Sequence, residues 1–274
     1  MKLLKTMAAA LAASTIAGSA FAADLPSRKV APAYIAPAPV FTWTGFYLGL
    51  NAGYAWDSTA YATSMLPGSH LGALANVLSV SASGTGSGSR GGFTGGAQAG
   101  FNYQMGMFVA GVETDIAFVP KAFSLNGSGI LTTGNPYLIN HSINSGVFGT
   151  VRGRLGVAFD RALIYATGGL AYRTGNYSWN YFDTLFAATG GASAGLKLGW
   201  TIGGGVEYAF APNWTVKAEY LHSDFGTVDT TGIVVSTTGG VNVVSTSARH
   251  RSDLVRLGVN YKFGWGGAPV VAKY

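Results

Sequence analysis

The stretch Leu196–Phe210, which reads LKLGWTIGGGVEYAF, has a side-chain period of two. Bulky apolar residues occupy alternate positions, and the positions between them hold mostly glycine and threonine, with Lys197 and Glu207 as the charged residues. Successive side chains of a β-strand point to opposite faces, so the pattern predicts one strand with an apolar face and a glycine-rich face. In a soluble sandwich or barrel the second face would meet water and would be rich in charged and amide side chains. The stretch therefore raises the question of which face lies inside.

The composition favours a membrane-inserted β protein. The 274 residues are 48% hydrophobic and 10% charged, with a mean hydropathy of +0.28, whereas about a quarter of the residues in an ordinary soluble protein are charged. After the N-terminus no uninterrupted apolar run approaches the roughly 20 residues that a membrane helix needs. The 41 glycines occur inside the alternating segments as well as between them. The sequence has no cysteine, which excludes a disulfide scaffold and thiol chemistry.

The first 43 residues predict export followed by a linker. Lys2 and Lys5 precede a short apolar core, and Ala20-Phe21-Ala22 has the form of a signal-peptidase site, so residues 1–22 are predicted to be a cleaved signal peptide. The apolar core is too short for a membrane anchor. Residues 23–43 contain four prolines, which hold the chain extended and prevent pairing in a central strand. We interpret this segment as a periplasmic linker.

Alternating segments recur through residues 44–263, which we predict to be a β-barrel domain. There are about eight of them, each near the 9–11 residues that a tilted membrane strand requires. Short turns at 105–106, 160–162 and 211–213 alternate with long polar connections at about 57–92, 119–145, 174–194 and 223–250. This order predicts an all-β fold, a transmembrane antiparallel up-and-down β-barrel with long extracellular loops and short periplasmic turns.

Two segments do not show the alternation of apolar and polar positions. GTGSGSRGG at 84–92 is of low complexity and is predicted to be a flexible loop; it lacks the strand-to-helix context and the lysine of a phosphate-binding loop. LIYATGGLAYR at 163–173 is apolar on both faces. The alternation therefore leaves the phase of the fifth strand open.

Contact with lipid would explain why one face of the strand at 196–210 is apolar and the other is rich in glycine. If the apolar faces meet lipid, the glycine-rich faces line a narrow lumen, where glycine leaves space for large neighbours. Charged residues in such a lumen need partners, and we expect Glu113 and Asp115 to lie beside Arg152 and Arg154, Glu207 to face Lys217, and Glu219 to reach Arg256. The alternative is an ordinary sheet with solvated charges on one face, and the uniformly apolar opposite face argues against it.

Aromatic residues gather at the ends of the predicted strands, as in the girdles at the two interfaces of a membrane barrel. One predicted girdle lies beside the short turns and chain ends and comprises Phe46, Tyr103, Phe108, Phe159, Tyr208, Phe210, Trp214, Tyr261 and Phe263. The other comprises Tyr54, Trp56, Phe93, Phe118 and Tyr220.

Several segments together resemble a known family. WTGFYLGLNAGYAW (43–56), GVETDIAF (111–118), GTVRGRLGVAFDR (149–161), LIYATGGLAY (163–172) and EYLHSDFG (219–226) are similar to the rhizobial outer-membrane barrel family typified by the 25- and 31-kilodalton outer-membrane proteins of alpha-proteobacteria. The resemblance covers residues 41–263. It implies an eight-stranded outer-membrane barrel and, for some relatives, haemin binding or small-porin activity.

The last strand resembles an assembly signal. Gly258, Tyr261 and Phe263 match the pattern by which the barrel assembly machinery recognises a C-terminal strand, so this machinery is an expected partner. Residues 264–274 continue beyond that pattern as a C-terminal extension.

We expect a non-enzymatic integral outer-membrane protein that contributes to envelope integrity and surface interaction, with a lumen plugged by charged pairs and no cofactor or metal site. The formal net charge is +6, and +4 once Lys2 and Lys5 leave with the signal peptide. This surplus favours contact with outer-membrane lipid and anionic lipopolysaccharide. The basic residues form no run, which argues against nucleic acid as a partner.

Two other functions stay open. A haemin- or ligand-binding surface protein, or a small porin, is one; His70, His141, His222 and His250 fall in the long connections or at their ends, and His222 and His250 are the candidate haemin ligands. A lipid-modifying enzyme using His222, Ser223 and Asp224 is the other. Adjacent strand residues point to opposite faces, so these three do not converge without a bend.

Overall fold

The computed structural model describes residues 41–66, 71–183, 186–187, 192–235 and 240–263. The predicted signal peptide at 1–22, residues 23–40 of the linker, and the extension at 264–274 lie outside the described residues. The compact unit that holds the barrel begins at Phe41.

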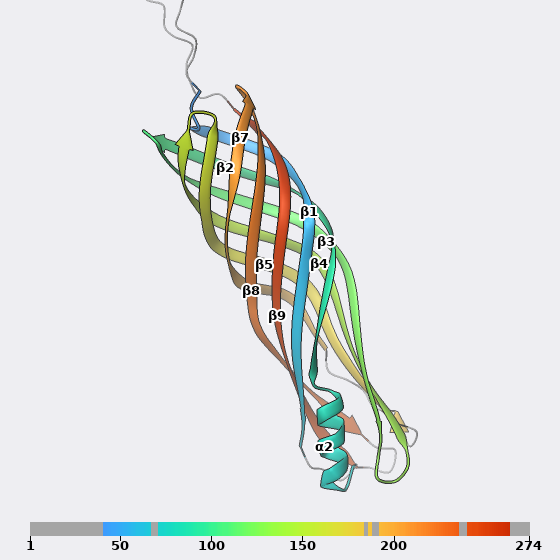
Figure 1. Cartoon of the computed structure of the whole chain (residues 1–274). Coiled ribbons are helices and arrows are strands. Elements are labelled where there is room, and N and C mark those ends of the chain that lie inside the picture. Colours follow the sequence, from blue (N-terminus) through green and yellow to red (C-terminus); the bar gives the residue numbers. More distant parts are fainter. Residues whose placement is uncertain (1–40, 67–70, 184–185, 188–191, 236–239, 264–274) are drawn as a thin grey trace, which may run out of the picture. The chain divides into compact units, whose positions relative to one another are not determined.

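Eight long antiparallel strands close into a ring (Figure 1). They are β1 (Gly45–Met65), β2 (Gly86–Met105), β3 (Phe108–Ile130), β4 (Pro136–Phe159), β5 (Ala162–Asp183), β7 (Ala192–Ala211), β8 (Trp214–Val235) and β9 (Val241–Lys262). Each strand pairs with the next, β5 with β7, and β1 closes the ring on β9. The short strand β6 (Phe186–Ala187) adds to β5. The predicted eight-stranded up-and-down barrel is confirmed.

The turns at one end of the barrel contain two residues each. Gly106 and Met107 join β2 to β3, Asp160 and Arg161 join β4 to β5, and Pro212 and Asn213 join β7 to β8. Gly106 has a φ of +61°, in the left-handed region that glycine enters without steric cost. The described chain ends near Phe41 and Phe263 lie at this same end (Figure 1).

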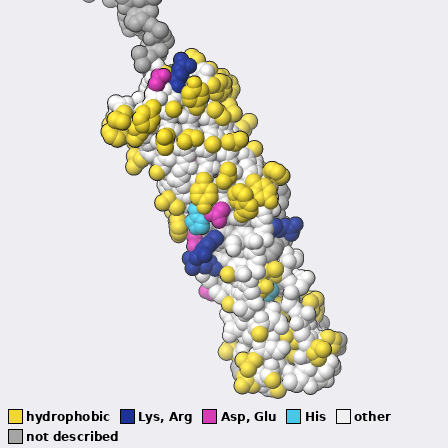
Figure 2. Space-filling view, viewed as in Figure 1, with side chains coloured by type: hydrophobic (Ala, Val, Ile, Leu, Met, Phe, Trp, Pro, Cys, Tyr) yellow, Lys and Arg dark blue, Asp and Glu magenta, His cyan; other side chains and the backbone are white. Residues whose placement is uncertain are grey.

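The alternating faces are disposed as predicted. The apolar residues of the opening stretch point outward; Leu198 is 65% exposed and Val206 54%, while Glu207 between such positions is 4% exposed. A belt of apolar side chains covers the half of the barrel that is nearer the short turns (Figure 2). Because the ring is closed, its backbone groups are paired without water, as a lipid environment requires.

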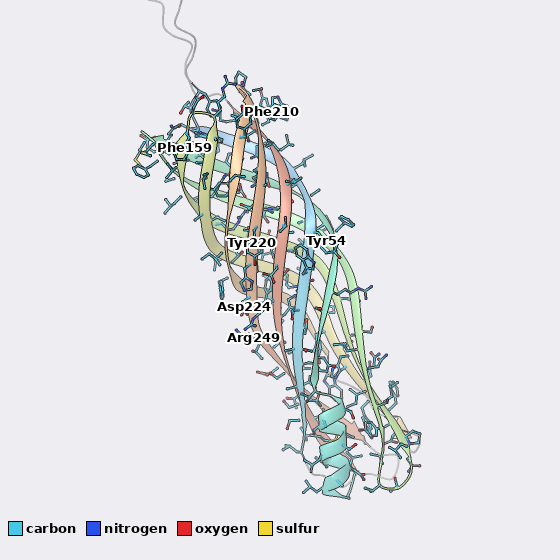
Figure 3. All side chains as sticks on the ribbon, viewed as in Figure 1. Tyr54, Phe159, Phe210, Tyr220, Asp224 and Arg249 are labelled. Carbon is cyan, nitrogen blue, oxygen red and sulfur yellow. The ribbon has the colours of Figure 1, made fainter. Side chains whose placement is uncertain are left out.

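Aromatic side chains mark two levels on the outer surface. Phe159 and Phe210 lie near the end with the short turns, and Tyr54 and Tyr220 lie at a second level towards the other end (Figure 3). Asp224 and Arg249 lie beyond Tyr220, outside the second level (Figure 3). The spacing agrees with the two predicted girdles.

The structure assigns the phase of β5. Leu163 and Tyr165 are buried, whereas Ile164 and Leu170 are exposed, so the odd positions point into the barrel. Leu163 and Tyr165 pack with other apolar residues at the inner end of the lumen, namely Trp43, Val109, Ala158 and Ala209. An apolar plug thus closes this end, which is why both faces of β5 are apolar.

The predicted strand length is wrong. The eight strands contain 20 to 24 residues each, about twice what a bilayer needs. Strands occupy most of the four connections that were predicted to be long loops. In the segment 84–92, predicted to be a flexible loop, β2 begins at Gly86. The extensions form a second apolar core that includes Tyr137, Ile139, Trp179 and Tyr181. The composition of these segments predicted loops, but burial of their apolar side chains in this core stabilises them as strands.

β-Bulges separate the membrane part from this outer extension. The register shifts on β4 between Ser145 and Phe148 and on β8 between Asp224 and Thr227. A bulge inserts one residue and so exchanges the two faces. In β4 the buried positions are even at Arg152 and odd at His141. A single alternating pattern therefore cannot run the length of the strand, and sequence analysis ended the strands at these points.

The helix α2 (Leu74–Ser83) lies in the outer extension, within a connection predicted to be loop. Val77 and Val80 are buried in the second core. The hydroxyl groups of Ser79 and Ser83 lie 2.8 and 2.7 Å from the Tyr137 hydroxyl oxygen. Among the described residues no helix is long and apolar enough to cross a membrane.

Replacing Leu257 by Arg should destabilise the folded barrel. Leu257 lies on β9 in the apolar belt and is 63% exposed, and an arginine on the lipid face near mid-bilayer costs about 2–4 kcal/mol. The measurement is the urea midpoint of the protein in lipid vesicles. Leu257→Ile is the matched control and should stay near wild type; equal midpoints for Leu257→Arg and wild type would contradict the assignment of this face.

Acidification should loosen the outer extension through His141. Burial lowers the pKa of His141 from its usual 6.5 to about 4, and its Nδ1 lies 2.8 Å from the Tyr177 hydroxyl. Between pH 6.5 and pH 4 His141 is protonated in the unfolded chain and neutral in the folded chain. The contribution of His141 to the free energy of unfolding is therefore fully present above pH 6.5 and falls by up to about 3 kcal/mol as the pH drops to 4.

The measurement is the free energy of unfolding of wild type and His141→Phe between pH 4 and pH 7.5. The difference between the two proteins should change over this interval, because the variant cannot titrate at this position. A difference that is constant with pH would show that His141 does not contribute in this way.

Candidate functional site

Eight charged side chains meet inside the membrane part of the barrel. They are Glu113 and Asp115 from β3, Arg152 and Arg154 from β4, Glu207 from β7, Lys217 and Glu219 from β8, and Arg256 from β9. Each is at most 4% exposed. The set contains four carboxylates and four cations, so its formal charges balance. We refer to these eight residues as the lumen charge network.

Glu113 is at the centre of the network. Its carboxylate accepts hydrogen bonds from Arg152 Nη2 at 2.5 Å, from Lys217 Nζ at 2.7 Å and from Arg154 Nη1 at 3.3 Å. Arg256 Nη2 lies 3.4 Å from the same carboxylate. Four strands are thus joined through one side chain.

Asp115 and Glu219 are shared between two guanidinium groups. Arg152 donates to Asp115 at 3.0 Å and to Glu219 at 3.0 Å. Arg256 donates from Nη2 to Asp115 at 2.9 Å and from Nε to Glu219 at 2.8 Å. Arg152 and Arg256 thus lie beside the same two carboxylates.

Glu207 differs from its expected pairing. It lies opposite Lys217 in the register of β7 and β8, but its carboxylate accepts from Arg154 Nη2 at 2.7 Å and from Asn260 Nδ2 at 2.8 Å. The Lys217 ammonium reaches across the lumen to Glu113. In a narrow lumen a long side chain can reach a partner on the opposite wall as readily as one on the neighbouring strand. The sequence prediction paired only residues that lie opposite each other on neighbouring strands, so it missed these contacts.

Tyrosine and amide side chains complete the network, and sequence analysis missed them. The Tyr47 hydroxyl donates to Glu113 at 2.6 Å and accepts from Arg154 at 2.7 Å. The Tyr165 hydroxyl donates to Glu219 at 3.0 Å, and its ring centroid lies 3.9 Å from the Arg154 guanidinium carbon. The alternation of β1 already places Tyr47 opposite Leu48, on the lumen side. Tyr165 lies in the strand whose phase was open.

Lumen-facing glycine gives these rings their space. A Cβ on Gly205 would come within 2.7 Å of the Tyr165 hydroxyl oxygen, and a Cβ on Gly100 would overlap the Tyr47 ring. The glycine-rich face of the opening stretch is therefore the inner face, where its neighbours fill the lumen.

Apolar layers lie on either side of the network. The plug at the inner end contains Leu163 and Tyr165. On the outer side a second layer consists of Ala55, Ala117, Phe148, Ala171, Leu221, Phe225 and Leu254. The charges are thus held away from water on both sides.

The two candidate haemin ligands lie on opposite sides of the wall. His222 is partly exposed, and its Nδ1 lies 2.7 Å from Asp253 Oδ1. His250 faces inward, and its Nδ1 lies 2.9 Å from Thr59 Oγ1. The two imidazoles cannot ligate one haem iron together.

His222, Ser223 and Asp224 do not form a catalytic triad. Ser223 is buried inside the barrel and donates to Thr201 Oγ1 at 3.0 Å, whereas His222 binds Asp253. Asp224 accepts hydrogen bonds from Arg249 at 2.7 Å and Arg251 at 3.2 Å. The bend that would bring them together is absent from this described segment.

The three residues of the predicted assembly signal lie on β9 or directly after it. Gly258 faces the lumen, where a Cβ would approach Lys217 Cγ to 3.2 Å. Tyr261 and Phe263 point outward, and the Tyr261 ring contacts Trp214 at a centroid distance of 5.1 Å. Recognition by the assembly machinery stays a prediction.

Replacing Arg152 by Ala should destabilise the barrel by about 3–5 kcal/mol, because Glu113, Asp115 and Glu219 would lose a shared partner while staying buried. The measurement is the free energy of unfolding in lipid vesicles. Arg161→Ala, which removes an exposed arginine from the turn after β4, is the control and should stay within about 0.5 kcal/mol of wild type. Equal effects of both changes would mean that the network adds nothing specific.

Comparison with known proteins agrees with the fold. The sequence matches the family described as "Outer membrane protein beta-barrel domain" over residues 8–263. It is 35% identical over 264 residues to the 31 kDa outer-membrane immunogenic protein of Brucella melitensis, covering 95% of this chain and 100% of that protein. It is 25% identical over 269 residues to the 25 kDa outer-membrane immunogenic protein of Brucella abortus, covering 96% and 100% of the two chains.

Among solved structures, Neisserial surface protein A matches with a TM-score of 0.36 and 17% identity, over 80% of this chain and 98% of that one. The family match, the closed apolar-belted barrel and the Brucella relatives lead to one assignment. The chain belongs to the outer membrane protein beta-barrel family and is an outer-membrane protein.

Proposed function

We propose that this protein is a non-enzymatic, closed barrel that supports the integrity of the outer membrane and its surface contacts. The lumen charge network is the observation on which the proposal rests. A barrel that conducts solutes needs a hydrated path, and here the path is filled by eight paired charges and their tyrosine partners.

The energetics favour a closed lumen. The interior of an eight-stranded barrel is just wide enough for its own side chains. Arg152 and Arg256 each contact three carboxylates, so moving either side chain aside leaves buried charges short of partners. Opposite charges attract more strongly in such a confined region than on a wet surface. A steady aqueous pore would require several of these contacts to break together.

The outer surface supports a role in the lipid layer. Beyond the outer aromatic level, Arg249 and Arg251 are about half exposed and share the carboxylate of Asp224. Two guanidinium groups on one carboxylate leave a positive surplus at the depth of lipid head groups, where arginine binds phosphate through charge-assisted hydrogen bonds. This arrangement supports contact with lipopolysaccharide, and Figure 2 shows the basic group beside the apolar belt.

The other functions suggested by the sequence require arrangements that differ from this one. A small porin requires an open lumen. A haem held by His222 and His250 requires both on one side of the wall. A hydrolase or acyltransferase at residues 222–224 requires His222 and Ser223 to approach one another, and they lie on opposite faces.

The unaltered protein should show little or no steady conductance in planar bilayers. The double variant Arg152→Ala, Arg154→Ala should open more often, because it leaves Glu113 and Glu207 short of partners and admits water. The measurement is single-channel recording of refolded protein at matched protein-to-lipid ratios.

The control is Arg249→Ala together with Arg251→Ala, which removes two arginines outside the lumen and should leave the record unchanged. Stable large channels from the unaltered protein would refute the closed-barrel proposal and would point to a true porin.

A further inference from the structure

Three residues that precede β1 cross the inner mouth of the barrel. Phe41, Thr42 and Trp43 belong to no strand, yet Trp43 is only 1% exposed. Its ring belongs to the apolar plug, whose buried members besides Trp43 come from β3, β4, β5 and β7. β5 lies directly opposite β1 in the ring of eight strands, so the side chain of Trp43 reaches across to the far wall. We refer to Phe41–Trp43 as the lid.

Hydrogen bonds hold the lid on both sides of the mouth. On the far side, the Trp43 indole N–H donates to the Asp160 carbonyl oxygen at 3.2 Å, in the turn between β4 and β5. On the near side, the backbone N–H of Trp43 donates to Gln104 Oε1 at 2.8 Å, at the end of β2. Lys262 Nζ, at the end of β9, donates to the Thr42 carbonyl oxygen. Each of these contacts uses a side chain, so the lid can leave the mouth while the strand pairs stay intact.

Aromatic contacts add to the closure. The rings of Phe41 and Trp43 meet edge to face with their centroids 5.1 Å apart, and Lys262 Nζ lies 4.2 Å from the centroid of the Phe41 ring. Edge-to-face pairs and cations over aromatic rings are both attractive arrangements. The lid therefore closes as one packed unit and not as a single side chain.

Gly45 is the point about which the lid can turn. It follows Thr44 at the start of β1 and has a φ of +140°, a value that glycine adopts far more readily than other residues. A Cβ at this position would come within 2.9 Å of the Phe263 carbonyl oxygen. A side chain at position 45 would thus strain the junction between the lid and β1 while leaving the lid's own side chains in place.

The lid protects the lumen charge network on its inner side. Trp43 shares the apolar plug with Tyr165, whose ring centroid lies 3.9 Å from the Arg154 guanidinium carbon. Arg154 in turn donates to Glu207 at 2.7 Å. Only one layer of side chains therefore separates Trp43 from a buried ion pair. Opening of the lid would bring water to that layer from the inner mouth.

We propose that Phe41–Trp43 is an opening lid of the lumen. It turns about Gly45, and its release admits water to the apolar plug while the eight strands stay paired, as a local opening of low free energy within a stable fold. The inference goes beyond the proposed function, because it concerns access from the inner mouth and holds whether or not the charge network passes ions.

The test uses the absence of cysteine from the sequence. The substitution Ala209→Cys places a single reporter thiol in the apolar plug beside Trp43, at a fully buried position. The refolded full-length protein is treated in detergent micelles with the cationic methanethiosulfonate reagent MTSET, and mass spectrometry follows the rate of modification. A separate protein with Arg161→Cys, in an exposed turn at the same end of the barrel, gives the rate of an unprotected thiol.

Under the native lid the reporter should react at least about tenfold more slowly than the exposed thiol, because the reagent reaches it only during openings. Adding Trp43→Ala should raise the rate at least about tenfold, since truncation removes the packing of a buried tryptophan. Trp56→Ala is the matched control. It truncates an exposed tryptophan on the outer surface and should leave the rate unchanged.

The substitution Gly45→Ala distinguishes a lid that turns from a fixed seal, because it keeps Trp43. Backbone strain at the junction should raise the reporter's rate about tenfold. Gly134→Ala is the matched control, since Gly134 also has a positive φ, +83°, and lies between β3 and β4 at the outer end. It should leave the rate unchanged.

Heat-modifiable gel migration establishes that each variant is folded. A reporter that reacts as fast as the exposed thiol under the native lid would overturn the inference, because the mouth would then be open. So would an unchanged rate in the folded Trp43→Ala protein, or equal rates for Gly45→Ala and Gly134→Ala. None of these outcomes depends on conductance, so thiol labelling tests the lid and single-channel recording tests the closed barrel.

Discussion

The balanced charge network inside the lumen is the constraint on which the rest of the membrane part depends. Four carboxylates and four cations are buried together, and each is stable there only while its partners stay in place. Glu113 alone contacts side chains from β4, β8 and β9. The strand register must hold these groups in reach of one another. A shift of one residue on any of these strands would carry charges to the lipid face, where they are strongly unfavourable.

Glycine and tyrosine on the inner face follow from the same constraint. Tyr47 and Tyr165 supply hydroxyl groups to the carboxylates, and their rings occupy space that a side chain on Gly100 or Gly205 would take. The two apolar layers then keep water away from the charges on either side. A barrel of this size therefore acts as a packed core in which the polar side is inside and the apolar side meets lipid.

The outer extension is a separate structural solution. Bulges on β4 and β8 exchange the faces of these two strands at the boundary, so that Tyr137 of β4 turns inward. There it joins Trp179 of β5, whose phase does not change, in an apolar core outside the membrane. Rigid strands in place of long loops hold these side chains at defined positions.

The sequence by itself determined the barrel, its strand order and the face that meets lipid, because a period of two and a glycine-rich polar face are local properties of each strand. It also predicted an inner face for the eight charges, because they alternate with the apolar residues. The tertiary structure decided the rest. The partners of Glu207 and Lys217 depend on distances across the lumen, and the phase of β5 depends on an apolar plug built from several strands. The length of the strands could not be predicted either. Bulges interrupt the alternation, and the outer halves of the strands have a composition typical of loops. These halves are ordered as strands because the second core buries their side chains.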